Sequence, residues 1–397
     1  MYLKRLSILA ALAISATTLV ATPANSASIA GTACPKVSAT KTVSNIKYTC
    51  VKSGKKLVWN KGVKAPAATP TPAPTKSPEA VPTPTPTPTP TFVPPTAPTS
   101  FDNLIENYKG IAYAAWSKSR AKIESSNAIA STIVMHQGAN SVIPNKNPQI
   151  AYDLTARLYD GFAMPKKTDI LAFGWADRDW AVSKMDELMP SAGSRWIKDM
   201  ACATKETCWG GGAFSDGKGN YLLVITTEVI DDNHTSGTLE VHEYTHIIQQ
   251  SQMTKSQPWP PTTDWPSSWY LEGHAEFSQN AAIFNKSYDE YLKNRYAVSQ
   301  NLFKNPSYDS AFFEKYFVVT PPQSWFQEHD RWLQYDAGGM LIEILTALKG
   351  PDSTMELWRK MGNGVSFYDA FKQIWDYDFD KALPIIAKAI ALEVGKK

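Results

Sequence analysis

The sequence predicts an α+β protein in which a small sheet is followed by a mostly helical half. Two apolar runs of strand type, 169–174 and 221–230, lie in the first half of the main domain. From residue 237 onward, apolar side chains recur instead at helical spacing. A short segment with β-type runs and two cysteines precedes this domain, beyond a proline-rich tract. Strands first and helices later favour segregated layers.

The N-terminus has the layout of a secretory signal peptide. Lys4 and Arg5 precede an apolar run over 6–20, and small residues continue to Ala27. That run is too short to span a bilayer comfortably, and no later stretch approaches the necessary length. Residues 1–27 therefore predict export, and we expect a secreted or cell-wall associated protein without a transmembrane segment.

Residues 28–64 are expected to form a small basic β module. Short β-type runs separated by Ser-Asn and Ser-Gly predict hairpins, and so small a core needs a covalent staple. Four cysteines in an exported chain favour disulfides; proximity pairs Cys34 with Cys50 and Cys202 with Cys208, although other pairings stay open. The module carries eight lysines and no acid. It is either an adhesion module for an anionic cell-wall polymer or a solvated basic appendage.

Residues 65–100 are expected to be a linker, followed by the main domain at 101–397. The linker contains an unbroken Thr-Pro alternation over 82–91, which is typical of extended polyproline II and forms no core. In the main domain we expect helices at 103–126, 149–160, 178–189, 237–251, 268–284, 334–349, 353–361, 366–376 and 380–394.

The net charge of +3 conceals an asymmetry along the chain. Residues 1–100 carry eleven Lys or Arg and one acid, a net charge of +10, whereas the remainder carries 29 basic and 36 acidic residues, a net charge of −7. A nucleic-acid enzyme is expected to have a basic working domain. The acidic main domain therefore argues against a nucleic-acid partner.

The candidate metal-binding motif is the His-Glu-Tyr-Thr-His run at 242–246. On a helix, His242 and His246 project from one face, at the spacing that two ligands of a tetrahedral zinc require. Glu243 lies between them, where a carboxylate can take a proton from water at the metal. The alternative interpretation is two partly buried histidines on an ordinary amphipathic helix.

A second motif begins about one loop further on, with 25 residues between His246 and Glu272. The Trp-Tyr-Leu-Glu-Gly-His-Ala-Glu-Phe run at 269–277 resembles the second zinc helix of the gluzincin metallopeptidases, the thermolysin-like superfamily. The resemblance implies Glu272 as the third zinc ligand and Glu276 as a carboxylate that hydrogen-bonds a ligand histidine. An exchange of these two roles stays open. His274, two positions from Glu272, is expected to face away from the metal.

The resemblance extends less specifically over about residues 210–375 and implies a gluzincin-like fold for the main domain. It makes Tyr335 the first candidate and His329 the second for the donor to the oxyanion of a tetrahedral intermediate. The alternative interpretation of Tyr335 is a packing residue at a helix start. It also implies that the strand at 221–230 is the sheet edge that binds extended substrate. Gly210–Gly212 is expected to be a loop that approaches substrate or a plain turn.

The resemblance implies hydrolysis of peptide bonds in a peptide or protein substrate. Gluzincin aminopeptidases carry a glutamate that binds the substrate amine, but the Gly-Lys-Gly-Asn run at 217–220 stands in its place. We therefore expect an endopeptidase. The alternatives are a catalytically silent zinc-containing binding protein of the cell envelope and a zinc amidase that acts on cell-wall peptides.

Overall fold

The computed structural model describes residues 28–44, 46–64, 92–253 and 266–396. The chain divides between Thr89 and Pro90 into two compact units, each described here by itself. The expected signal peptide and the Thr-Pro run at 82–91 lie outside the described residues. Among the described residues, no helix combines the length and apolar character needed to cross a bilayer.

The N-terminal unit contains a four-stranded antiparallel sheet built around β2. Its strands are β1 (Thr40–Val43), β2 (Ile46–Ser53), β3 (Lys56–Trp59) and β4 (Val63–Lys64), and β2 pairs with each of the others. Tyr48, Cys50 and Trp59 are its buried side chains. The predicted Cys34–Cys50 disulfide is confirmed, and it supplements a core of this small size.

The main unit contains a second four-stranded sheet, in the order β5-β6-β8-β7. Its strands are β5 (Thr132–Gln137), β6 (Lys167–Phe173), β7 (Gly211–Ser215) and β8 (Tyr221–Thr226). β5, β6 and β8 are parallel, and β7 is antiparallel to β8. The sequence predicted β6 and a longer β8 but missed β5 and β7. The expectation that the strand at 221–230 forms the sheet edge is wrong, because β8 lies between β6 and β7.

Helices make up most of the rest of this unit. Their bounds are α1 (Ile111–Ser125), α2 (Pro148–Leu158), α3 (Arg178–Leu188), α4 (Asp232–Ser236), α5 (Thr238–Gln252), α6 (Ser268–Ile283), α7 (Tyr288–Val298), α8 (Gln300–Lys304), α9 (Ser310–Tyr316), α10 (Trp325–Glu328), α11 (Leu333–Lys349), α12 (Pro351–Gly362), α13 (Phe367–Trp375) and α14 (Phe379–Glu393). The nine predicted helices correspond to α1, α2, α3, α5, α6 and α11 to α14. The short helices α4 and α7 to α10 were not predicted.

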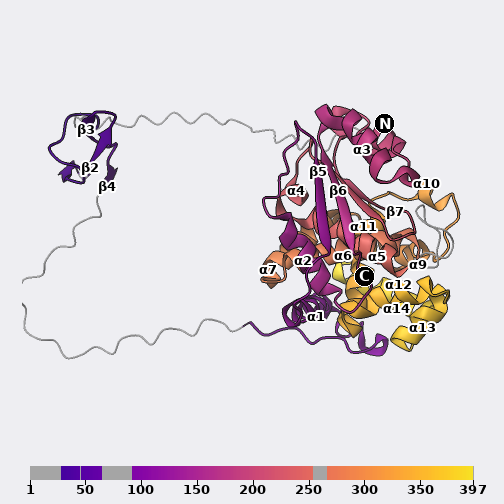
Figure 1. Ribbon diagram of the computed structural model, residues 1–397. Coiled ribbons are helices and arrows are strands. Elements are labelled where there is room, and N and C mark those ends of the chain that lie inside the picture. Colours follow the sequence, from indigo (N-terminus) through magenta and orange to yellow (C-terminus); the bar gives the residue numbers. More distant parts are fainter. Residues whose placement is uncertain (1–27, 45, 65–91, 254–265, 397) are drawn as a thin grey trace, which may run out of the picture. The chain divides into compact units, whose positions relative to one another are not determined.

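Helices cover both faces of the second sheet. Side chains on one face, including Ile170 and Leu223, pack into the main helical core. The other face, including Leu171 and Val224, packs with α3 and with the confirmed Cys202–Cys208 disulfide. Figure 1 shows α3 on the opposite side of the strands from α5, α6 and α11. The fold is α+β as predicted, but the helices are not segregated to one face, because parallel strands require crossover connections.

Helices α6 and α11 approach each other closely at two glycines. A Cβ atom on Gly273 would lie 2.2 Å from the carbonyl carbon of Gly338, and one on Gly338 would lie 2.1 Å from the carbonyl oxygen of Trp269. Any side chain at either position would therefore collide with main-chain atoms. The crossing brings Glu272 of α6 close to Tyr335 of α11. Burial raises the pKa of the Tyr335 hydroxyl, and the negative charge of Glu272 raises it further.

A buried ion cluster joins α7, α11 and α14. The Arg295 guanidinium lies 2.6 Å from Glu343 Oε2 and 3.0 Å from Glu393 Oε1, and the Tyr291 hydroxyl donates to Glu343. One cation thus faces two carboxyl groups. Burial raises the pKa of Glu393 to about 8, with Arg295 opposing the rise and the charge of Glu343 adding to it. The cluster favours one protonated carboxyl group near neutral pH.

The main unit begins before residue 101. The Phe92 ring contacts the rings of Tyr113 and Tyr288, with centroids 5.5 and 5.9 Å away. Gly110 lies so close to the carbonyl of Thr96 that a Cβ atom there would be 1.9 Å from its oxygen. Residues 92–100, which the sequence analysis placed in the linker, therefore pack against the main unit.

Candidate metal centre

Helix α5 places both histidines of the 242–246 motif in the protein interior. It starts after Gly237, whose φ of +92° ends α4, and every residue of α5 is buried. The Nε2 atoms of His242 and His246 lie 3.2 Å apart, and the ring planes are inclined at 80°. Both nitrogens face the same small volume, as the spacing of four residues predicts.

Helix α6 brings the Glu272 carboxylate to these nitrogens. Glu272 Oε2 lies 3.4 Å from His242 Nε2 and 3.2 Å from His246 Nε2. One ligand atom from each of the three residues lies within 4.8 Å of the other two. The group could therefore hold a metal ion, and imidazole nitrogen with carboxylate oxygen is a donor set that divalent transition metals accept.

The charges at this centre favour a cation. Burial alone would lower the pKa of His246, but the neighbouring Glu272 carboxylate outweighs it and raises the pKa to about 9. Burial would likewise raise the pKa of Glu272, but the two imidazoles hold that pKa far below its ordinary value. The protein thus stabilises positive charge against Glu272, and a metal cation supplies such charge while leaving the imidazoles neutral.

Gln249 orients His246, a role that the sequence analysis did not foresee. Gln249 Oε1 accepts a hydrogen bond from His246 Nδ1 at 2.7 Å, which leaves Nε2 free to face the centre. Gln249 Nε2 in turn lies 3.1 Å from the Leu271 carbonyl oxygen and 3.3 Å from His274 Nδ1. The amide therefore fixes the tautomer of His246 and ties α5 to α6.

Glu276 lies on the other side of the centre, beside His242. Its Oε2 is 3.8 Å from His242 Nδ1, and its Oε1 accepts a hydrogen bond of 2.8 Å from Gln279 Nε2. Burial raises the pKa of Glu276, against the influence of His242. The carboxyl group therefore lies beside His242, but the distance exceeds that of a hydrogen bond, and the hydrogen bond that the resemblance implies stays a prediction.

His274 faces away from the metal centre, as its position in the sequence predicts. It is fully buried, and Trp358 Nε1 donates to its Nδ1 at 3.0 Å. Its Nε2 lies 2.8 Å from the Tyr159 hydroxyl and 3.0 Å from the Thr354 hydroxyl. Burial lowers the pKa of His274 to about 3, so the ring is a neutral packing residue.

The Glu243 carboxyl group lies against the edge strand β7. A Cβ atom on Gly211 would lie 2.8 Å from Glu243 Oε1, so any other residue there would push the carboxyl group out of its position. Among the described residues, Glu243 Oε2 has no hydrogen-bond partner. Burial raises the pKa of Glu243, and the charge of Glu272 adds to this effect. A buried carboxyl group with an unused oxygen at a metal centre is suited to exchanging a proton with water.

Among the described residues, β8 is the only strand that pairs with β7, so the edge of β7 next to Glu243 has no strand beside it. Thr226 N donates to the Gly210 carbonyl oxygen, and in an antiparallel pair the bonded residues alternate along the strand. The N–H and C=O of Gly211 therefore point away from β8, whereas the carbonyl of Ala213 on the same edge accepts a hydrogen bond from Gln250 Nε2 at 3.1 Å. Gly210–Gly212, expected to be a loop, thus lead into the edge strand.

The two candidates for the oxyanion donor lie in different surroundings. The Tyr335 ring stacks on His242, with centroids 5.7 Å apart and planes inclined at 23°. Burial raises the pKa of its hydroxyl, and the negative charge of Glu272 adds to the rise. His329 instead contacts the rings of Tyr316 and Trp325, with centroids 5.1 Å away in both cases. The structure thus brings the Tyr335 ring to His242 of the candidate metal centre and packs His329 in an aromatic cluster.

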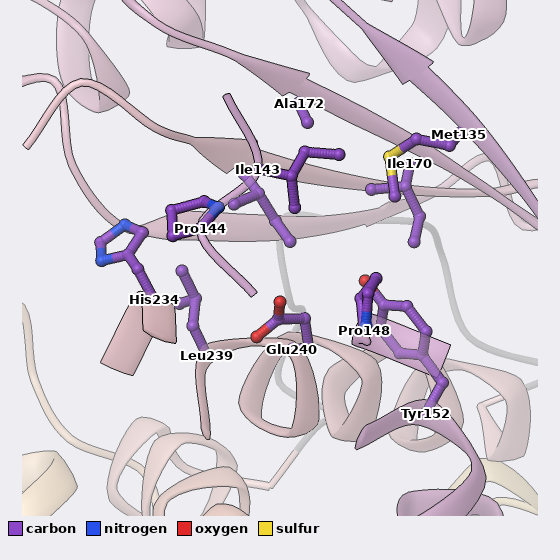
Figure 2. Close-up of a pocket in the computed structure, with 11 residues that line it drawn as sticks. Met135, Ile143, Pro144, Pro148, Tyr152, Ile170, Ala172, His234, Leu239 and Glu240 are labelled. Carbon is purple, nitrogen blue, oxygen red and sulfur yellow. The ribbon is translucent and has the colours of Figure 1, made fainter. Parts of the chain in front are cut away.

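An apolar cavity lies on the other side of α5, between that helix and the sheet (Figure 2). Glu240 points into it and is 3% exposed. Asn145 Nδ2 donates to Glu240 Oε1 at 3.0 Å, but among the described residues Glu240 Oε2 and the Tyr152 hydroxyl have no partner. This second buried carboxyl group of α5 is separate from the group that could hold a metal.

Comparison of the chain with models of protein families, with curated proteins and with solved structures gives no match.

Proposed function

We propose that this chain is a zinc-dependent peptidase that cleaves within peptide chains. The observation that carries the proposal is the convergence of His242 Nε2, His246 Nε2 and Glu272 Oε2 within 4.8 Å, with the Glu243 carboxyl group between the histidines in sequence. Two imidazoles and one carboxylate are a ligand set of catalytic zinc, which keeps a further position open for water or substrate.

Zinc bound there would supply Lewis acidity, which makes water a nucleophile at neutral pH. Glu243 then accepts the proton of the attacking water and returns it to the leaving amine. The hydroxyl of Tyr335, whose ring stacks on His242, donates to the oxyanion that forms on the substrate carbonyl. Gln249 keeps His246 Nε2 turned towards the centre throughout.

A peptide substrate is supported by the free edge of β7. The N–H and C=O of Gly211, which face away from β8 and bond to no other strand of the part that the structure describes, offer one donor and one acceptor to an extended main chain. Peptides add to a sheet edge through such groups. Gly211 also lies against Glu243. A substrate paired at Gly211 would therefore have its main chain next to the residue that handles the proton.

The proposal includes export and a place at the cell wall. The two disulfides are compatible with an oxidising compartment. The N-terminal module, with its excess of lysines, would hold the enzyme near an anionic wall polymer.

The test uses the full mature chain, a metal assay and two glutamates of the same helix. Elemental analysis should give one zinc per chain, and the protein should hydrolyse an unfolded protein substrate. Glu243→Gln should retain the zinc and lose activity by a factor of at least about 100, because an amide cannot accept the proton. Glu240→Gln is the matched control, since Glu240 is buried on α5 but faces the separate cavity; it should retain both zinc and activity.

Three outcomes would contradict the proposal. Failure of the protein to take up zinc would show that the proposed zinc site does not exist. Zinc uptake without hydrolysis of any peptide would leave a zinc-containing binding protein. Release of cell-wall peptides with no cleavage of protein would identify an amidase instead.

A further inference from the structure

Two tryptophans are exposed beside the proposed active site. Trp209 is 43% exposed and Trp332 is 36% exposed, although large aromatic side chains are normally the first to be buried. Their rings stack on each other, with centroids 5.7 Å apart and planes inclined at 23°. Exposed aromatic side chains that gather at one place mark sites of recognition more often than scattered single residues do.

The pair is connected to the metal centre by a continuous series of ring contacts. The Trp332 ring lies 5.4 Å from the Tyr335 ring, and the Tyr335 ring lies 5.7 Å from the His242 ring. One tyrosine ring thus separates Trp332 from a residue that could hold the metal. An extended peptide advances about 3.3 Å per residue, so a substrate bound at the centre would reach the pair within about three residues of the cleaved bond.

Both tryptophans stand on segments that are fixed in place. Trp209 follows Cys208, which is bonded to Cys202, and it comes two residues before Gly211 on the edge strand. Trp332 precedes the first residue of α11, and its N–H donates to Asp330 Oδ1 at 3.0 Å. The two rings therefore lie close in sequence to Gly211 in one case and to Tyr335 in the other, on segments that are fixed by the disulfide and by α11. Preorganised aromatic anchors of this kind lose little entropy on binding.

We infer that Trp209 and Trp332 form a subsite for an aromatic side chain of the peptide substrate, within three residues of the cleaved bond. The inference rests on the proposed function and narrows it to substrates with Phe, Tyr or Trp near the cleavage point. Planar rings are the groups that indoles bind most favourably, through offset or edge-to-face contacts. The pair determines specificity and takes no part in proton transfer.

The experiment measures binding and turnover separately, with the zinc-loaded full chain. Two peptides with blocked ends are compared. One carries Phe on both sides of the cleavage point, the other carries Ala at the same positions, and the remaining residues are identical. Binding is measured by calorimetry with protein carrying Glu243→Gln, and kcat and KM are measured with the active protein. Trp209→Ala and Trp332→Ala are each introduced both into the Glu243→Gln protein, for the binding assay, and into the active protein, for the kinetic assay. Trp180→Ala is the matched control, because Trp180 is 38% exposed and lies on α3, on the opposite side of the strands from α5, α6 and α11, which carry the proposed active site.

Each of the two subsite variants should weaken binding of the Phe peptide about tenfold, as expected for loss of an aromatic contact, and the Ala peptide less than twofold. The change should appear in KM and in Kd, with kcat nearly constant, and Trp180→Ala should behave as wild type. Circular dichroism checks that each variant is folded.

Several results would overturn the inference. An equal loss of binding affinity for both peptides would show that the pair only supports the fold. Faster turnover of both peptides by the variants would show that the two rings obstruct access of the substrate to the active site. Binding of a glycan in place of the aromatic peptide would assign the pair to a different ligand. If no peptide is cleaved but the preference for Phe persists in binding, the proposed catalytic function fails and the subsite remains. If peptides are cleaved without any preference for Phe, the subsite alone fails.

Discussion

Two adjacent glycines of α11 should respond in opposite ways to the same substitution. Gly338 lies at the crossing with α6, where a Cβ atom would be 2.1 Å from the Trp269 carbonyl oxygen and 3.0 Å from the Gly273 Cα. At Gly339 the nearest atom to a new Cβ is Glu276 Cγ, at an ordinary contact distance of 3.4 Å. Both glycines are interior residues of the helix. The perturbation is therefore Gly338→Ala compared with Gly339→Ala.

The magnitudes follow from two opposing contributions. Alanine in a helix interior is more favourable than glycine by about 1 kcal/mol. At Gly339 nothing opposes this gain, so Gly339→Ala should raise the free energy of unfolding by up to about 1 kcal/mol. At Gly338 the neighbouring atoms belong to the main chain and cannot rotate away, so overpacking should reach the upper end of its usual range, about 3 kcal/mol. Gly338→Ala should therefore lower the free energy of unfolding by roughly 2 kcal/mol.

Urea unfolding followed by far-ultraviolet circular dichroism measures both variants, because the signal is dominated by the helical main unit. The expected difference between them is about 3 kcal/mol. If Gly338→Ala proved as stable as Gly339→Ala, the close crossing of α6 and α11 would be incorrect. The proximity of Glu272 to Tyr335, which depends on that crossing, would then be incorrect as well.

Three further predictions concern the metal, the ion cluster and the N-terminal module. In zinc titrations, Glu272→Ala should abolish tight uptake while Glu276→Ala should weaken binding only about 10–100-fold, and the reverse ranking would exchange their roles. Folding raises the pKa of Glu393 to about 8, so the folded protein holds a proton on this group more tightly than the unfolded chain does. The free energy of unfolding should therefore fall as the pH rises from the unfolded-state pKa of Glu393 towards 8. Glu393→Gln should thus match wild type in urea unfolding at about pH 4 and exceed it at about pH 8, whereas equal stability at both values would contradict the assignment. Deleting residues 28–91 should leave peptide turnover unchanged and reduce retention on isolated cell walls at low salt; retention that survives the deletion or high salt would rule out an electrostatic tether.

The parts of the site that the sequence predicted are those set by local geometry. His242 and His246 share a helix face through their spacing alone, and the structure places their Nε2 atoms 3.2 Å apart. The long helices were predicted for the same reason, since their apolar residues recur along a single element. The position of Glu272 came from a resemblance, because no local rule relates a residue of α6 to a residue of α5.

Features that depend on distant partners could not be predicted. No residue of β5 is buried and its apolar run is only three residues long, and β7 begins with two glycines that indicate a turn. Both are strands because β6 and β8 offer them hydrogen-bonding edges. Gln249 follows His246 by three residues, a weak signal that gains meaning only once α6 supplies the Leu271 carbonyl.

The glycines at the centre give the proposed substrate preference a physical basis. Gly211 lets the edge strand approach Glu243, and the contact of Gly273 with Gly338 sets α11, with Tyr335, against α6. Next to the proposed metal ligands, β7 thus presents the main-chain groups of Gly211, whose hydrogen bonds do not distinguish one substrate residue type from another. In the proposed peptidase, such a surface would bind the main chain of a substrate without selecting among its side chains. Selection must then come from side chains further from the ligands, and the stacked rings of Trp209 and Trp332 are suited to that role.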